Sequence, residues 1–247
     1  MTGDEGFLKV KDGSPDSNGD LYFLLTAAHE LKAPLALIRQ LSLSLETGTI
    51  SRSERERMFR QITLTSERAL RLTTDLSRSS RLEDSLFELE PLNPRQLCEE
   101  VAHELTPLYK AKNRQIRVAS RYRPILVVAN RDLLRRIMLN FGDNALHYAE
   151  GTEPVELKIS SHESGGKIRM GVRDYGPAVP PDIWQRLQSN LGTNTQTLHA
   201  RPQASGLGLY VAGQFAAVMH GRIGATRHRD GATFYVDLVA SSQLRLL

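Results

Sequence analysis

A histidine beside a carboxylate is the first pair in this sequence that could carry out covalent chemistry. His29 directly precedes Glu30 and stands five residues before Pro34. Near neutral pH an imidazole nitrogen can act as a nucleophile or carry a proton, and an adjacent carboxylate can accept a hydrogen bond from the second ring nitrogen and raise its basicity. His29 and Glu30 are therefore candidate catalytic residues, although a lone exposed histidine often has no chemical role.

A pair of asparagines could bind a metal ion. Asn140 and Asn144 stand four residues apart in a strongly periodic stretch, so both amides project from the same face of a helix. Their oxygens suit Mg²⁺, a hard cation that prefers oxygen ligands and keeps several waters. Paired asparagines are also common as plain surface residues, so the spacing alone leaves both interpretations open.

Two glycine-containing turns could bind other parts of a ligand. Asp174 and Gly176 follow a predicted strand, and a carboxylate there can only accept hydrogen bonds, which suits an amine. Gly206 and Gly208 open a predicted helix, where backbone N–H groups and the helix dipole favour an anion such as phosphate. Either turn by itself is more often structural.

The elements that must position His29 form a helical hairpin. Apolar residues recur at alternating steps of three and four along residues 20–46 and again from Ser53 to about Leu82, which predicts two helices with a packing seam on each. Ser53 and Glu56 have the spacing of a capping box for the second helix. Two helices bury too little surface alone, so we expect two hairpins to dimerise into a four-helix bundle. The first seam consists of Leu24, Ala28, Leu31, Leu35, Ile38 and Leu45.

After residue 86 the pattern changes to mixed strands and helices. We predict strands at 87–90, 115–120, 124–129, 154–161, 167–174, 222–228 and 232–239, and helices at 94–111, 130–149 and 207–220. Asn93 and Asn130 are expected to cap the first two of these helices. The polar residues 188–205 have no period and are predicted to form a loop. The fold class is therefore α+β: residues 1–19 form a flexible tail, 20–86 a dimerisation domain, and 87–247 a two-layer α/β sandwich.

Composition narrows the class of protein. The chain has 32 Lys and Arg residues and 28 Asp and Glu residues. Basic and acidic residues alternate along the sequence, and aromatic residues are not interleaved with the basic ones. This pattern argues against nucleic acid as a partner. The second predicted helix is rich in arginine and is either a solvated face or a docking surface for an acidic protein. The single cysteine, Cys98, excludes an internal disulfide, and no apolar run approaches the ~20 residues of a membrane span, so we expect a cytoplasmic location.

The motifs together resemble those of sensor histidine kinases. The run from His29 to Leu35 is similar to the H box of that family, and the run from Leu139 to Tyr148 is similar to its N box. The turns at Asp174 and Gly206 resemble its two glycine boxes, and all four motifs occur in the family's order. The resemblance implies a bundle domain that carries the phosphorylated histidine, followed by a domain that binds ATP and Mg²⁺.

The resemblance also implies roles for individual residues. His29 is the expected site of phosphorylation, Asn144 the Mg²⁺ ligand and Asn140 its partner. Asp174 is expected to bind the exocyclic amine of adenine, with Tyr148 near the ring. The other implied nucleotide-binding positions are His147, Gly176, Ser205, Gly206, Leu207 and Gly208.

Three residues depart from the family pattern on the nucleotide side. His147 stands where histidine kinases usually have Lys or Arg, and Ala178 and Ala204 each replace a glycine. Alanine strains the backbone wherever a positive φ is required, so these departures would weaken nucleotide binding.

The resemblance implies an ATP-dependent protein-histidine kinase that passes its phosphoryl group to an aspartate of a response regulator. Two alternatives follow from the departures. One is a pseudokinase scaffold with weak ATP binding, and the other is a phosphorelay module whose histidine is phosphorylated by another kinase.

Overall fold

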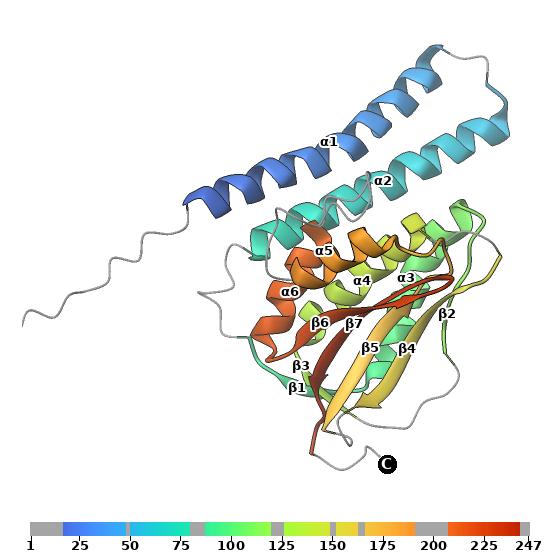
Figure 1. The fold of residues 1–247 in the computed structure, drawn as a ribbon. Coiled ribbons are helices and arrows are strands. Elements are labelled where there is room, and N and C mark those ends of the chain that lie inside the picture. Colours follow the sequence, from blue (N-terminus) through green and yellow to red (C-terminus); the bar gives the residue numbers. More distant parts are fainter. Residues whose placement is uncertain are drawn as a thin grey trace, which may run out of the picture.

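The computed structural model describes residues 17–47, 50–79, 87–119, 126–148, 152–162, 166–190 and 207–242. These residues form three layers: a long helical hairpin, a layer of helices and a twisted sheet (Figure 1). The hairpin lies along the outer side of the helical layer, and the sheet covers the other side. In this part of the chain no helix is long and apolar enough to cross a membrane.

The hairpin consists of α1 (Ser17–Thr47) and α2 (Arg52–Ser79). The first helix begins three residues before its predicted start, so residues 17–19, which were assigned to the tail, are helical. Polar residues are compatible with a first helical turn because its N–H groups face solvent. Residues 1–16 of the predicted tail lie outside the described residues.

The capping box of α2 lies two residues upstream of the predicted one. Ser51 Oγ accepts the backbone N–H of Glu54 at 3.2 Å, and Glu54 Oε2 accepts the backbone N–H of Ser51 at 3.1 Å. Glu56 forms an ion pair with Arg52 at 3.2 Å instead. The Ser53–Glu56 prediction was wrong because both pairs have the Ser-x-x-Glu spacing, and spacing alone does not rank them.

The sheet has five strands in the order β2-β4-β5-β7-β6, and a separate two-stranded sheet pairs β1 with β3. Only β2 and β4 are parallel within the large sheet. Ile168, Met170 and Val172 alternate along β5 and are buried against the helices, as expected for a sheet with one covered face. The strands are β1 (Glu90–Leu92), β2 (Ile116–Val118), β3 (Val127–Ala129), β4 (Val155–His162), β5 (Lys167–Arg173), β6 (Arg222–His228) and β7 (Gly231–Val239).

The helices of the sandwich supply the other half of its core. The α+β prediction is confirmed, and α4 lies centrally between α3 and α6 (Figure 1). The buried side chains of all three helices join those of the sheet in one hydrophobic core. The helices are α3 (Pro94–Ala111), α4 (Arg131–Tyr148), α5 (Pro181–Asn190) and α6 (Leu207–Val218).

Helix α5 and the position of β1 were not predicted. Pro181 at the start of α5 and Asp182 in its first turn are both favourable at a helix N-terminus, but the helix is short and mostly polar, so it has little apolar period. It overlaps the first residues of the predicted loop, and residues 191–206 lie outside the described residues. Strand β1 begins at the last residue of the predicted 87–90 strand and continues through Pro91. Proline argues against a central strand, but β1 pairs with only one neighbour, so Pro91 is tolerated there.

Asn130 fixes the start of α4. Its Oδ1 accepts the backbone N–H of Leu133 at 3.1 Å, and its Nδ2 donates to the carbonyl of Glu88 at 3.2 Å. The predicted cap is therefore confirmed, and it also ties α4 to the chain that follows the hairpin.

We predict that Asn130→Ala lowers the free energy of unfolding by about 1–2 kcal/mol, because it removes an N-cap and the bond to Glu88. Urea unfolding of the full chain, followed by the fluorescence of the single tryptophan, Trp184, measures this change in the sandwich. Asn130→Asp keeps the capping oxygen but not the donor, so it should recover only part of the loss. Wild-type stability in Asn130→Ala would contradict the assignment.

Candidate functional site

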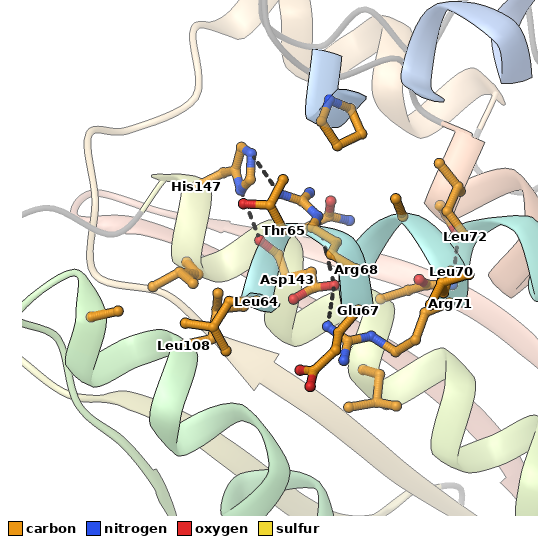
Figure 2. Close-up of a pocket in the computed structure, with 18 of the residues that line it drawn as sticks. Leu64, Thr65, Glu67, Arg68, Leu70, Arg71, Leu72, Leu108, Asp143 and His147 are labelled. Carbon is orange, nitrogen blue, oxygen red and sulfur yellow. Dashed lines mark hydrogen bonds and ion pairs between the residues drawn. The ribbon is translucent and has the colours of Figure 1, made fainter. Parts of the chain in front are cut away.

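A cleft of about 1350 Å³ separates the hairpin from the helical layer. It is lined from one side by α1 and α2 and from the other by α3, α4 and α6. Figure 2 shows side chains of α2 reaching toward Asp143 and His147 of α4. The predicted site residues that line this cleft are Glu30, Asn140, Asn144, His147 and Gly208.

The two asparagines lie on the cleft side of α4. Both are half-buried, and Asn140 Nδ2 donates to the carbonyl of Gly208 at 3.4 Å. A Cβ atom on Gly208 would stand 3.8 Å from the Asn140 side chain, which is ordinary contact. The first turn of α6 is therefore held against the asparagine pair, as expected if both contribute to one site.

Asp143 adds a carboxylate beside Asn144. Its Oδ2 is 3.9 Å from Arg68 Nε and 3.8 Å from Arg71 Nη2. Its Oδ1 is buried and has no hydrogen-bond partner in the described structure. A buried acceptor without a partner is costly unless a ligand completes it.

These oxygen donors fit a hydrated Mg²⁺ ion. The described residues contain no group of three or more His, Cys, Asp or Glu side chains that could hold a metal ion by themselves. Two amide oxygens and one carboxylate instead suit a cation that keeps several waters and takes further ligands from a phosphate.

The imidazole of His147 is held in its neutral form. Arg68 Nη1 lies 3.2 Å from His147 Nε2, and a guanidinium can only donate, so Nε2 is the acceptor. Nδ1 then carries the proton and donates to the backbone carbonyl of Asp143 at 3.1 Å. Loss of hydration on the packed side of the ring, then the charges of Arg68 and Lys112, lower the pKa of His147 to about 4.

Asp174 lies at the end of β5, outside the lining of the cleft. It is 2% exposed, and its Oδ1 accepts the backbone N–H of Ala232 at 3.2 Å. Gly231 adopts φ +127° there, and a Cβ atom on it would stand 2.4 Å from the Asp174 carbonyl oxygen. The first two residues of β7 thus hold the carboxylate, and the sequence analysis did not single them out.

The H box meets the cleft through Glu30. Glu30 is half-buried and lines the cleft with Ala33 and Pro34, whereas His29 is exposed and is not among the lining residues. Gly176 is half-buried beyond β5, and Leu207 is buried at the start of α6. The side chain of Tyr148 and all of Ser205 and Gly206 lie outside the described residues.

Sequence reasoning missed the residues through which α2 contacts α4. Asp75 accepts from Arg136, Arg71 lies 3.7 Å from Glu104, and Arg68 reaches Asp143 and His147. The arginine-rich composition of this helix was noticed, but its charges were assigned to solvent or to another protein. The three-residue step from Arg68 to Arg71 places both on one helix face, and this was the available signal.

Comparison with known proteins shows which families this chain resembles. Residues 129–241 match the histidine kinase-, DNA gyrase B- and HSP90-like ATPase family. The sensor histidine kinase AruS of Pseudomonas aeruginosa is 25% identical over 224 residues, and the histidine protein kinase SaeS of Staphylococcus aureus is 26% identical over 216 residues. These matches cover 87% and 85% of this chain, so they extend into the hairpin, which the ATPase family match does not. This chain is similar to sensor histidine kinases.

Solved structures share the fold of this chain. Full-length ShkA in complex with AMPPNP matches with a TM-score of 0.59 and 24% identity, over 92% of this chain and 47% of ShkA. The Acinetobacter baumannii histidine kinase AdeS matches with a TM-score of 0.56 and 18% identity, over 85% of this chain and 97% of the solved AdeS chain. This chain spans only 22% of the length of AruS and 61% of the length of SaeS.

We predict that His147 stays neutral throughout the physiological pH range. Its ring resonances in an NMR titration should move with a midpoint near 4, well below the ~6.5 of a free histidine. The spectrum of His147→Gln identifies the signal among the seven histidines. Because the folded pKa is lowered, the neutral ring favours the folded arrangement fully above pH ~6.5, and this contribution is lost as the pH falls toward 4.

Arg68→Gln should raise that midpoint part of the way, because it removes one charge and opens the ring to water. A midpoint near 6.5 in the wild type would contradict the contacts described for His147.

Proposed function

We propose that this chain is the catalytic core of a two-component kinase, which transfers the γ-phosphoryl group of ATP to His29 and then to an aspartate of a response regulator. One observation carries the proposal: Glu30, next to the proposed phosphoacceptor, lines the same cleft as Asn140, Asn144 and Gly208. The comparisons with AruS and SaeS support it, and the AMPPNP bound to ShkA supports ATP as the nucleotide.

Residues of α4 and α6 hold the nucleotide in this proposal. The N-terminus of α6, with Leu207 and Gly208, offers backbone N–H groups and a positive dipole to the phosphates. Asp174 selects adenine through its exocyclic amine. Asn144, oriented beside Asn140, ligates Mg²⁺, which neutralises phosphate charge when it is bound. Tyr148, Gly176, Ser205 and Gly206 complete the contacts that the motif resemblance assigns to this site.

The phosphoryl transfer needs a histidine with one basic nitrogen. The lone pair of one ring nitrogen of His29 forms the new P–N bond as the P–O bond to the ADP leaving group breaks in line. The proton of the other ring nitrogen passes to the carboxylate of Glu30, which leaves a neutral phosphohistidine. The exposure of His29 supports this role, because the same side chain must later meet an aspartate on another protein.

The response regulator docks on the hairpin in this proposal. The N-terminal half of α2 is exposed and carries Arg52, Arg55, Arg57 and Arg60, which suit an acidic partner surface. ATP and such regulators are found inside the cell, so we also propose that this core works in the cytoplasm.

A second copy of this chain covers the hairpin. Leu35 is 57% exposed and Phe59 55% exposed, although both belong to long amphipathic helices. Other seam residues, such as Leu31 and Ile38, are half-buried within the hairpin itself. The remaining exposed apolar side chains support a homodimer that packs two hairpins into a four-helix bundle.

We predict that the purified protein labels itself from radiolabelled ATP and Mg²⁺. His29→Gln should abolish the label, because it removes the nucleophile and keeps the size of the side chain. Asn144→Ala should lower the labelling rate by about 100-fold, the scale for losing one stabilising group in an active site.

The same assay separates the alternatives. Tight ATP binding without label would support a pseudokinase scaffold, and labelling only by a second kinase would support a phosphorelay module. Wild-type labelling in His29→Gln would remove His29 from the mechanism.

We predict that Leu35→Glu converts the dimer to a monomer, because it places a charge in the proposed bundle seam. Analytical ultracentrifugation at micromolar concentration measures the mass. Val239→Glu is the matched control: Val239 is 43% exposed and lies on β7, away from the hairpin. A wild type of monomer mass, or a Leu35→Glu variant of dimer mass, would contradict the proposed seam.

A further inference from the structure

The cations that line the cleft come mainly from the hairpin. Helix α2 contributes Arg57, Arg60, Arg68 and Arg71 to the lining. The arginines that α4 contributes are engaged elsewhere: Arg135 donates to Glu104 and Arg136 donates to Asp75. A ligand with several negative charges in this cleft would therefore depend on α2 for much of its charge complement.

The C-terminal turn of α4 offers no cation of its own beside Asn144. The basic residue of that turn is His147, and its hydrogen bonds assign it the neutral tautomer. Arg68 of α2 reaches this turn: it lies 3.2 Å from His147 Nε2 and 3.9 Å from Asp143 Oδ2. Lys112, just after α3, also lines the cleft. The hairpin thus adds a positive charge that contacts the turn beside Asn144.

Arg68 is also suited to bind phosphate. Its side chain is 39% exposed, and its ion pair with Asp143 is long and shared with Arg71. A guanidinium has five N–H donors in a planar fork that matches phosphate oxygens, and a neutral imidazole acceptor uses one of them. The group therefore combines a fixed position with capacity for a further anionic partner.

We propose that Arg68 is a phosphate-binding residue of the nucleotide site, so that α2 of the hairpin completes a site otherwise built by α4 and α6. This inference rests on the proposed function, and it adds a contact from the bundle domain. With Arg68 in place the cleft keeps about 1350 Å³, more than the ~300–1000 Å³ of most small-molecule sites, so docking of α2 leaves room for the ligand.

The arrangement couples nucleotide binding to the position of the hairpin. If docking of α2 raises the affinity for ATP, then ATP must stabilise the docked hairpin by the same factor. A bound nucleotide with fewer phosphates than ATP would then stabilise the docked hairpin less.

Binding measurements on the full-length chain test the inference without relying on kinase activity. Isothermal titration with ATP and with adenosine, both in Mg²⁺, should show that Arg68→Gln weakens ATP binding by about tenfold, because a charge-assisted contact is lost. Adenosine has no phosphate, so its affinity should not change. Arg39→Gln is the matched control: Arg39 is exposed on α1 of the same hairpin and does not line the cleft.

A second substitution provides a rescue. His147→Lys in the Arg68→Gln background returns a cation to the turn after Asn144 from α4 itself, so it should recover ATP affinity. Circular dichroism on each variant confirms that α2 remains folded.

Each of the other outcomes contradicts either the inference about Arg68 or the proposed function. Unchanged ATP affinity in Arg68→Gln overturns the inference alone, and tighter binding shows that Arg68 obstructs the site instead of completing it. An equal loss for adenosine and ATP assigns Arg68 a structural role and also overturns the inference. A wild type that binds no ATP overturns the proposed function itself, and the inference with it.

Discussion

Helix α4, which has 18 residues, packs in the hydrophobic core on one face and lines the cleft on another. Leu134, Ile137, Met138 and Phe141 are fully buried against the sheet and its neighbouring helices. Asn140, Asp143, Asn144 and His147 occupy the intervening positions and face the cleft. Because one rigid helix carries both sets, the packing of its apolar face determines where the site groups stand.

Helix α3 reinforces this arrangement from the side. Tyr109 donates from its hydroxyl to the carbonyl of Gly142 at 2.8 Å, and a Cβ atom on Gly142 would stand 2.3 Å from Leu105 Cδ1. The two helices therefore approach closely beside Asp143, so the backbone under the cleft residues has little room to move.

Charged side chains form several of the contacts between the hairpin and the sandwich. Asp75 is 5% exposed and pairs with Arg136, and Glu104 accepts from Arg135 and lies near Arg71. A buried ion pair adds little net stability, because desolvation offsets the attraction, but an unpaired partner costs about 3–5 kcal/mol. These pairs therefore add little to the stability of the contact between α2 and α4. They favour the one register of α2 on α4 in which every buried charge has its partner.

Local signals in the sequence predicted most of the elements but not the contacts between distant ones. Asn93 and Asn130 were recognised as caps because a cap acts on its own first turn, and the spacing of Asn140 and Asn144 places both on one face wherever the helix lies. Helix α5 has too few apolar residues for a period to be seen. The contact of Arg68 with His147 joins residues 79 positions apart. The sequence of α2 indicates that Arg68 and Arg71 share a helix face, but it does not indicate which residues that face contacts.

The bond between Asn130 and Glu88 has a mechanical consequence for α4. Glu88 lies just before β1, and its carbonyl accepts from the residue that caps α4. A displacement of Glu88 is thus transmitted to the first turn of the helix that bears the asparagine pair. The same helix contacts α2 across the cleft, through Arg136 near its N-terminus and through His147 in its last turn. A shift of α2 on α4 would therefore act on both ends of the helix whose middle carries the asparagine pair.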